Sequence, residues 1–407
     1  MKKFLYVLAS LVVSLAVSAN AQTPISDAAM RAATPTSATP FAAPEPPSIA
    51  AKAYILIDAH SGRVLAEQNA DERLGPASLT KMMTGYVLSE QVANGQVSWN
   101  DTTHVSSNAW AQNPVFEGSS LMWIQVDTDV SLIDLYRGLV ISSGNDASVA
   151  IAEHLAGSED AFAGLMNQQA QRLGMSNTNF VNAHGLPDEA HYTTARDLAT
   201  LARAMVFDHP EDYAIYSERT YTYNNIRQGN RNELLGQLGV DGIKTGHTED
   251  AGYCLVTSAE QDGMRLISVI LGTDSKRARK EETRKLLAWG QRFFETRKLF
   301  ADTSAALAEA KVWAGADKSV QLGVENGIYV TVGRGQFDLL EAKTTVEPVV
   351  MAPVTAGTEL GRVSVMVGEQ EVANLPLVAR VDVPEAGFFA ALWDKLVLFV
   401  LQLFGQI

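Results

Sequence analysis

The spacing of apolar residues predicts a short β-hairpin followed by a series of helices. Ala53 to Asp58 and Arg63 to Gln68 alternate apolar and polar residues on either side of His60-Ser61-Gly62, a pattern typical of two strands joined by a turn. From Ser78 to Gln91 the apolar residues recur at helical spacing, and Pro76 suits the start of a helix. Further segments with helical spacing are 131–141, 145–155, 158–173, 194–207 and 277–295.

Strand patterns return between the last two of these helices. Gly242 to Thr248, Gly252 to Ala259 and Met264 to Gly272 have the composition of strands. Thr194 and Asp197 have the spacing of a capping box at the start of helix 194–207. Because strands lie at both ends of the segment with helices between them, we expect an antiparallel sheet flanked by helices. The predicted fold class is α+β, over residues 49–299.

The pattern changes after about residue 300 to short segments that alternate or are rich in β-forming residues. These segments are 319–324, 328–332, 344–349, 359–367 and 370–383. Glu325-Asn326-Gly327 and Val367-Gly368-Glu369 have the residues of turns between strands. We therefore expect a small all-β domain over residues 300–384, and no residue in it suggests catalytic chemistry.

The C-terminal segment, residues 385–407, is predicted to be an amphipathic helix. Asp394, Lys395, Gln402 and Gln406 fall near one side of this helix, and Phe, Leu, Val and Trp dominate the rest. Two central charges and a short apolar run make spanning a bilayer unfavourable, so an anchor lying in the plane of the membrane is expected. The alternatives are a terminal helix packed on its own β domain and a dimer contact.

The first 48 residues are expected to direct export and to tether the folded part. Lys2 and Lys3 precede an apolar run, and Ala19-Asn20-Ala21 fits a small-x-small cleavage site, which predicts a secretory signal peptide over residues 1–21. Residues 22–48 hold six of the fourteen prolines and are predicted to form a flexible linker. We expect a mature, exported chain that begins at Gln22.

Charge and cysteine content exclude several classes of function. The formal net charge is -14, and it becomes -16 once Lys2 and Lys3 are removed, so nucleic acid is not an expected partner. Cys254 is the single cysteine, so no internal disulfide can form. We expect Cys254 to be a small buried apolar residue rather than a reactive thiol. No zinc-ligand spacing is present, and no metal or other cofactor is expected.

Three separated motifs supply the groups of a nucleophilic site. Ser78-Leu79-Thr80-Lys81 places a hydroxyl and an amine on one helix face, where a lysine with a lowered pKa could take the serine proton. Burial or neighbouring cations such as Lys244 would lower that pKa. Ser143-Gly144-Asn145 adds a hydroxyl and an amide, and Lys244-Thr245-Gly246 adds a cation and a hydroxyl for an anionic group.

Together the three motifs are the mark of penicillin-binding proteins and class A β-lactamases. Longer matches surround them, and the whole set resembles the D-alanyl-D-alanine carboxypeptidases of the penicillin-binding protein 5 and 6 type over nearly the whole chain after residue 48. The matching segments are Gly75 to Lys81, Gly118 to Met122, Ser142 to Ala147, Asn182 to Leu186 and Asp241 to Thr248. The resemblance implies a β-lactamase-like catalytic domain with a helical subdomain, followed by the β domain and the anchor helix.

The resemblance also implies a role for each motif residue. Ser78 would be the acyl-ester nucleophile and Lys81 its general base. Ser143 would relay a proton to the leaving nitrogen, and Asn145 would bind the substrate amide and fix Lys81. The residue pair Asn145-Asp146 is open to another interpretation, because both types favour helix caps.

The expected substrate-binding residues lie on the strand that carries the third motif and on the helix after it. The substrate carboxylate would lie near Lys244 and Thr245, and Gly246 would allow close backbone approach. The oxyanion hole would be made by the backbone N–H groups of Ser78 and His247. A structural role remains open for the His247 side chain. Arg279 aligns with a carboxylate-binding arginine, and the alternative is a solvated helix face.

The implied partners are peptidoglycan stem pentapeptides, β-lactam inhibitors and a membrane surface, at the periplasmic face of a bacterial inner membrane. Cys254 departs from the asparagine common at this position, which leaves fine substrate preference open. Three alternatives remain. A class A β-lactamase needs a deacylating glutamate, which residues 174–187 lack. An endopeptidase or transpeptidase shares the site, and an inactive wall-binding scaffold would have lost a motif residue, whereas none is lost.

Overall fold

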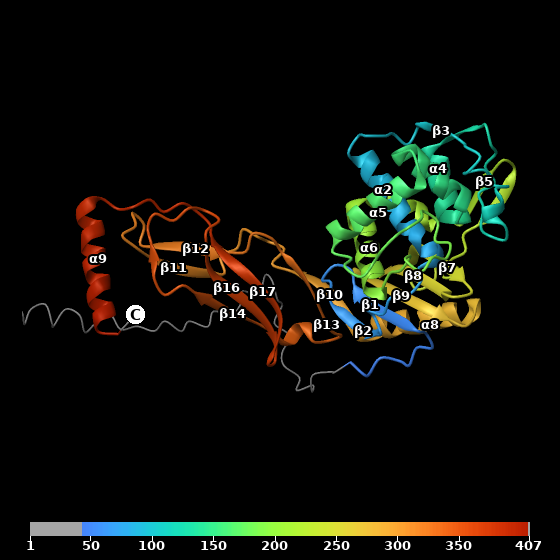
Figure 1. Cartoon of the computed structure of the whole chain (residues 1–407). Coiled ribbons are helices and arrows are strands. Elements are labelled where there is room, and N and C mark those ends of the chain that lie inside the picture. The colour runs from blue at the N-terminus through green and yellow to red at the C-terminus, as the bar shows by residue number, and fades with distance from the viewer. Residues whose placement is uncertain (1–42, 406–407) are drawn as a thin grey trace, which may run out of the picture. The chain divides into compact units, whose positions relative to one another are not determined.

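The computed structural model describes residues 43–405, which form two compact units divided between Arg297 and Lys298. The first unit spans residues 43–297 and the second spans residues 298–405. The predicted signal peptide, 1–21, and most of the predicted linker, 22–48, lie outside the described residues. Figure 1 shows helices and strands mixed in the first unit, and strands with one terminal helix in the second.

The first unit is built on a five-stranded antiparallel sheet in the order β2-β1-β9-β8-β7. Its strands are β1 (Ala53–Asp58), β2 (Val64–Gln68), β7 (Val240–Thr248), β8 (Gly252–Gln261) and β9 (Met264–Thr273). The N-terminal hairpin and the three later strands were all predicted. The structure joins them by pairing β1 with β9, with Ala53 opposite Leu271 and Asp58 opposite Leu266.

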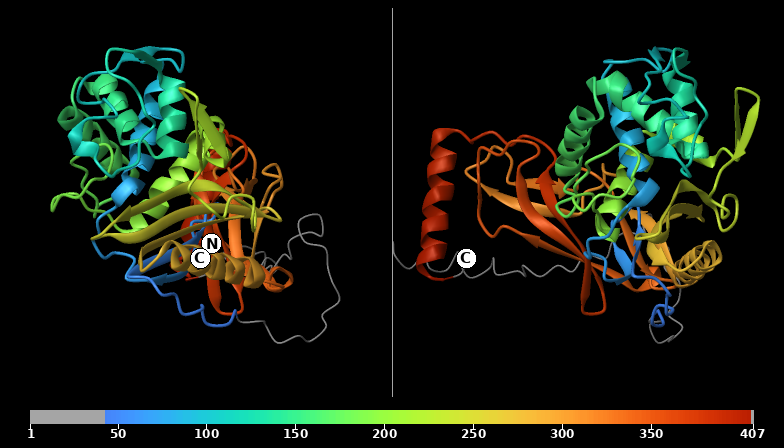
Figure 2. Two further views of the ribbon diagram at one scale, coloured as in Figure 1. Left: turned by 90° about the vertical axis from the view of Figure 1, so that its right-hand side faces the viewer. Right: turned by 45° about the vertical axis from the view of Figure 1, so that its right-hand side comes forward.

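Both faces of this sheet are covered, because successive residues of a strand point to opposite sides. Ile55 and Ile57 belong to the large core shared with the helical region, whereas Tyr54 and Leu56 pack in a second core with residues of α8 (Lys276–Phe293). The views in Figures 1 and 2 agree in placing α8 along one face and the other helices toward the opposite face. The alternation expected for β1 is wrong: residues Ala53 to Ile57 form a continuous apolar run, which this double burial explains.

The helical region lies between β2 and β7 in the chain. Its main helices are α2 (Thr80–Ala93), α3 (Leu132–Arg137), α4 (Asn145–Ala156), α5 (Glu159–Leu173), α6 (Ala195–Asp208) and α7 (Pro210–Tyr213). Thr194 caps α6 by accepting a hydrogen bond from the Asp197 N–H, as predicted. The Asp197 carboxylate does not complete a reciprocal box; it accepts hydrogen bonds from the Asn177 N–H and the Thr178 hydroxyl.

One local prediction for this region was right only in part, and two short strand pairs were not predicted. The segment predicted as one helix over 131–141 is α3 followed by a π-helical turn, Gly138–Ser142, which ends at Ser143 with a φ of 59°. A hairpin of β5 (Thr220–Tyr223) and β6 (Ile226–Gly229) was not predicted. Another short pair, β3 (Thr102–His104) and β4 (Asp129–Ser131), was also missed, because strands this short carry little alternation.

The second unit contains a six-stranded sheet in the order β14-β16-β17-β12-β11-β15. Its strands are β11 (Ala308–Trp313), β12 (Ser319–Gly323), β14 (Leu340–Val346), β15 (Val350–Met351), β16 (Glu359–Val367) and β17 (Gln370–Ala379). The division between the units falls within β10 (Phe294–Leu299), and β13 (Ile328–Gly333) belongs to the second unit. The all-β prediction is confirmed, although β11 was not among the predicted strands.

The second unit ends in α9 (Phe388–Leu403), whose buried residues, Ala391 and Leu398, lie on the same side of the helix as Asp394. Asp394 Oδ2 accepts hydrogen bonds from the Ala314 N–H at 3.0 Å and from Lys318 Nζ at 2.8 Å. Large apolar side chains lie exposed along the rest of the helix. They are Phe388, Phe389, Leu392, Trp393, Leu396, Phe399, Val400 and Leu403. Among the described residues, no helix is both long and apolar enough to cross a membrane.

Candidate active site

The first motif straddles a change of helix type at the start of α2. Ser78 lies in a 3-10 turn, Ala77–Leu79, and Lys81 lies in the first turn of α2. The two side chains share one face, as the spacing predicted, with Lys81 Nζ 3.1 Å from Ser78 Oγ. Ser78 is half-buried, whereas Lys81 is buried with 1% of its surface exposed. The hydroxyl is therefore reachable and the amine is shielded from water.

Lys81 makes two shorter hydrogen bonds to groups that can only accept. Its Nζ donates to Asn145 Oδ1 and to the backbone oxygen of His184, both at 2.7 Å. A neutral amine has two N–H donors and one lone pair, and the two oxygens require both donors. The lone pair then faces Ser78 Oγ, where it can accept the hydroxyl proton. The surroundings of Lys81 thus select the orientation that a base needs.

Burial lowers the pKa of Lys81 from 10.5 to about 7, mainly because the charged amine is cut off from water. The nearby charges act in both directions: Asp146 and Glu159 raise this pKa, and Arg231 lowers it. A large neutral fraction of Lys81 is therefore present near neutral pH. The sequence suggested two causes for a lowered Lys81 pKa, burial and a neighbouring cation such as Lys244. Burial is the main cause, and the cation that lowers this pKa further is Arg231.

The second and third motifs meet through Lys244. Its Nζ donates to Ser143 Oγ at 2.9 Å and to the Thr245 backbone oxygen at 3.0 Å. The left-handed conformation of Ser143 follows the π-helical turn and directs the chain into α4. Burial lowers the pKa of Lys244 well below 10.5, and Lys81 lowers it further. Each of the two motif serines is therefore hydrogen-bonded to a buried amine, Ser78 to Lys81 and Ser143 to Lys244.

Asn145 and Asp146 do not cap α4, so that alternative was wrong. The N-cap is Gly144, which has no side chain, and Asn145 is bonded to Lys81. The buried Asp146 carboxylate accepts hydrogen bonds from three consecutive backbone N–H groups, those of Met122, Trp123 and Ile124, at 2.8, 2.8 and 3.1 Å. Asp146 therefore ties the segment after residue 118 to the start of α4. The helix cap was the only role that the sequence suggested for Asp146.

The third motif lies on β7 directly beside the nucleophile turn. A Cβ added to Gly246 would meet the Pro76 backbone oxygen at 3.0 Å and the Ala77 side chain at 3.3 Å. This close approach is the one that glycine was predicted to permit. Thr245 is buried beside Lys244, and His247, which follows Gly246, is exposed near the end of the strand.

His247 and Arg279 both lie near one aromatic ring, that of Tyr253. The His247 ring centroid is 3.9 Å from that of Tyr253, and the Arg279 guanidinium lies 5.9 Å from the same ring. Arg279 is buried with 7% exposure, whereas Lys276 and Arg277 on the same helix turn are exposed. The alternative of a solvated helix face is therefore wrong for Arg279. The structure selects it from its basic neighbours.

Cys254 has the buried position predicted for it, opposite Gly246 in the sheet. Burial raises the pKa of its thiol to about 11, so it is not a reactive thiolate near neutral pH. Within the part of the chain that the structure describes, no cluster of three or more His, Cys, Asp or Glu side chains could hold a metal ion.

Comparison with known proteins identifies the family of this chain. A family profile described as D-alanyl-D-alanine carboxypeptidase matches residues 40–275, and a profile described as penicillin-binding protein 5, C-terminal domain, matches residues 294–385. This chain belongs to the D-alanyl-D-alanine carboxypeptidase family. D-alanyl-D-alanine carboxypeptidase DacC of Escherichia coli is 45% identical over 366 residues, which cover 89% of this chain and 91% of the relative.

Other members of the family extend the agreement over both units. DacA of Escherichia coli is 43% identical over the same shares of the two chains. The crystal structure of penicillin binding protein 5 from Haemophilus influenzae superimposes with a TM-score of 0.80 at 40% identity, covering 84% of this chain and 99% of that one. The predicted fold class and family resemblance are confirmed.

Proposed function

We propose that this chain is a serine-type D-alanyl-D-alanine carboxypeptidase that removes the terminal D-alanine from peptidoglycan pentapeptides. This activity would serve cell wall biogenesis and cell shape. The observation that carries the proposal is the environment of Lys81. A buried amine with a pKa of about 7 keeps its donors on Asn145 and His184 and leaves a lone pair for the Ser78 hydroxyl. An inactive scaffold would have no need of such an arrangement.

In the proposed acylation step, Ser78 Oγ attacks the carbonyl carbon of the penultimate D-alanine while Lys81 takes the hydroxyl proton. The developing oxyanion is bound by the backbone N–H groups of Ser78 and His247. Ser143 relays a proton to the leaving nitrogen, and its bond to Lys244 Nζ supports that role because the amine orients the hydroxyl. Free D-alanine departs, and the rest of the peptide stays as an ester on Ser78.

Water then hydrolyses the ester, releasing the shortened peptide with a new carboxylate and restoring the Ser78 hydroxyl. Substrate recognition is assigned to Lys244, Thr245 and Arg279, which would bind the terminal carboxylate. A cationic pair suits this group because charge-assisted hydrogen bonds to carboxylates are strong. A β-lactam would acylate Ser78 in the same way and inhibit the enzyme.

We place the mature protein at the periplasmic face of a bacterial inner membrane, held by α9 lying in the membrane plane. Asp394 of α9 is bonded to Ala314 and Lys318 of the β domain, while most large apolar side chains of the helix are exposed. The helix also packs on its own β domain, as one alternative expected, but this contact leaves most of its large apolar side chains exposed. An apolar strip of this kind gains most by burial in lipid at the headgroup boundary.

The first test uses the chain from Gln22 to Ile407 in mild detergent, with fluorescent penicillin and with a pentapeptide ending in D-Ala-D-Ala. We expect label on the wild type, none on Ser78→Ala, and one D-alanine released per peptide. Folded wild type without label would disprove the serine mechanism. Preferential cleavage of cross-linked peptide dimers would instead identify an endopeptidase.

A further inference from the structure

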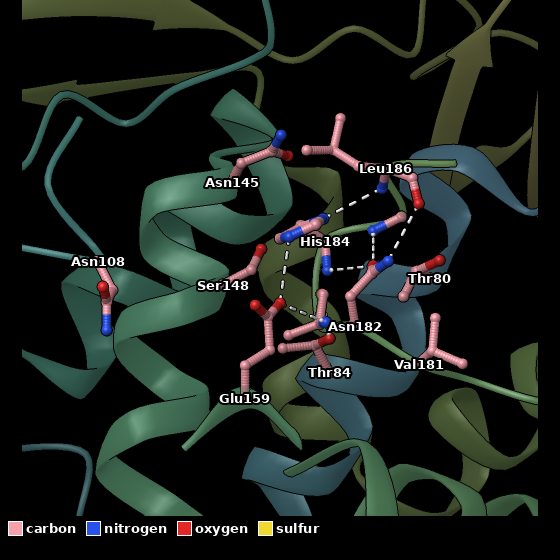
Figure 3. Close-up of polar contacts among 12 residues, drawn as sticks. Thr80, Thr84, Asn108, Asn145, Ser148, Glu159, Val181, Asn182, His184 and Leu186 are labelled. Carbon is pink, nitrogen blue, oxygen red and sulfur yellow. Dashed lines mark hydrogen bonds and ion pairs between the residues drawn. The ribbon is translucent and has the colours of Figure 1, made fainter. Parts of the chain in front are cut away.

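Glu159, the first residue of α5, contacts the segment that binds Lys81 from the other side. Its Oε1 accepts a hydrogen bond from the Ala183 N–H at 2.9 Å and lies 3.2 Å from His184 Nε2 (Figure 3). The His184 side chain is buried, and the Glu159 side chain is about two-thirds covered. None of the three catalytic motifs contains Glu159, and sequence reasoning gave it no role.

The hydrogen bonds of His184 determine which ring nitrogen carries the proton. Burial lowers the pKa of His184 to about 3, so the ring is neutral at ordinary pH. Nδ1 accepts a hydrogen bond from the Leu186 N–H at 3.1 Å, which leaves the proton on Nε2. That proton faces Glu159 Oε1. The carboxylate therefore fixes both the tautomer and the orientation of the ring.

The same residue, His184, provides the backbone oxygen that accepts from Lys81 Nζ at 2.7 Å. Its neighbour Ala183 donates its N–H to Glu159 and accepts from the Thr84 hydroxyl at 2.7 Å. Asn182 Oδ1 accepts the Gly185 N–H at 2.6 Å on the other side. Two of the contacts that hold this short segment are thus made by the Glu159 carboxylate. One is to Ala183 and the other is to His184, whose backbone oxygen accepts the hydrogen bond from Lys81.

We infer that Glu159 is a positioning residue for the general base: it holds the His184 carbonyl against Lys81, and its negative charge sets the pH range in which Lys81 can accept the Ser78 proton. This inference rests on the proposed function, because it assumes that neutral Lys81 activates Ser78.

The sign of the charge effect follows from the groups that face Lys81. Burial lowers its pKa, Asp146 from α4 and Glu159 from α5 raise it, and Arg231 lowers it. Lys244 from β7 is a second buried amine, and the two imidazoles nearby, His184 and His191, are neutral because burial lowers their pKa. Removing the Glu159 charge therefore lowers the pKa of Lys81 further. The acid limb of the acylation profile should move to lower pH.

The experiment measures the second-order rate constant for acylation by fluorescent penicillin between about pH 5 and pH 9 on the chain from Gln22. Glu159→Gln keeps an oxygen acceptor for Ala183 and His184 but removes the charge. The pH midpoint of its acylation profile should fall by a few tenths of a unit. When each rate is divided by the plateau rate of the same variant, acylation below the midpoint should be ~2–5-fold faster than in the wild type. Its plateau should stay within ~3-fold of the wild type, because the hydrogen bonds are kept.

Asp160→Asn is the matched control, since it removes one negative charge from the adjacent, exposed residue. Its midpoint should remain at the wild-type value because exposed charges are screened by solvent and salt. Glu159→Ala removes the acceptor as well, and its plateau should fall ~10-fold or more because the carbonyl loses its support.

The outcomes separate this inference from the proposed function. Wild-type protein that is folded but unlabelled would disprove the serine mechanism. Labelled wild type with an unmoved Glu159→Gln midpoint, or with equal shifts in Glu159→Gln and Asp160→Asn, would overturn the role of Glu159. A Glu159→Ala plateau equal to the wild-type plateau would remove the positioning part alone. If Glu159→Ala does not fold, the Glu159→Gln profile decides.

Discussion

Charged side chains usually lie at a protein's surface and large apolar side chains in its core, and the two units of this protein depart from this rule in opposite ways. The first unit buries charged side chains: Lys81 and Lys244 are 1% and 3% exposed, and Asp146 is fully buried. The second unit exposes large apolar side chains, with Phe389 at 84% and Trp393 at 59%. Buried charge and exposed apolar surface are both costly in water, and each marks a place where function outweighs stability. We propose that the cost tunes a base in the first unit and supplies a membrane contact in the second.

The strongest way to break this comparison is to remove the buried amine. Lys81→Met should lower the rate of acylation by penicillin ~10³-fold or more, because it deletes the base and leaves two buried oxygens without a donor. Lys276→Met, which changes an exposed lysine, should acylate at the wild-type rate. Acylation of Lys81→Met within ~10-fold of wild type would show that another group accepts the proton.

The exposed apolar surface of α9 can be tested in the same way. Replacing both Phe389 and Trp393 with Glu should weaken binding to lipid vesicles ~100-fold or more, since each side chain loses its burial in lipid. Cleavage of a soluble pentapeptide should not change. Val381→Glu alters an apolar residue of the same unit that is also exposed, and it should bind vesicles normally.

Salt distinguishes the two kinds of membrane attraction. The wild-type affinity for vesicles should change little between low and high salt, because α9 offers apolar area and almost no net charge. A steep loss of binding at high salt would mean that electrostatic attraction dominates instead.

The pH dependence of the wild type provides a further test of the buried base. Since burial lowers the pKa of Lys81 to about 7, acylation should rise with pH and level off above that value. Below the midpoint the rate should fall ~10-fold per pH unit, as the neutral fraction does. A rate that is constant from pH 5 to pH 9 would contradict Lys81 as the base.

Arg279 tests whether burial identifies a functional cation within the first unit. Arg279→Gln should lower kcat/KM for the pentapeptide by ~10–100-fold, because a charge-assisted bond to the substrate carboxylate is lost. Arg277→Gln is the matched control on the same helix turn, and its exposed side chain should be dispensable. Equal losses in the two variants would refute the assignment.

The smallest effect is expected at Cys254, which is buried and has no proposed catalytic role. Cys254→Ala should keep acylation within ~2-fold and lower the free energy of unfolding by about 1 kcal/mol, the cost of a small cavity. The rate is measured with penicillin and the stability by urea unfolding. A large loss of activity would show that the thiol contributes to the geometry of β7.

Local patterns predicted the elements of both units well, and they failed where long-range contacts decide. The helix starting at Thr194 and the strands around Lys244 were visible in the residue spacing, because capping and alternation are local. The π-helical turn before Ser143 was not, since the tertiary packing around Ser143 overrides the helical pattern of 131–141. The capping interpretation of Asn145 failed for the same reason: a lysine 64 residues away binds its side chain.

The sequence by itself determined which chemical groups this protein has and how they are spaced within each motif. It also determined the apolar character of α9 and the alternation of the strands. Only the tertiary structure decided how those groups behave. The pKa of Lys81, the selection of Arg279 over Arg277 and the contact between Glu159 and His184 all depend on burial and on charges brought together from distant parts of the chain. Electrostatic effects follow distance in space and access to water, which a linear order of residues does not contain.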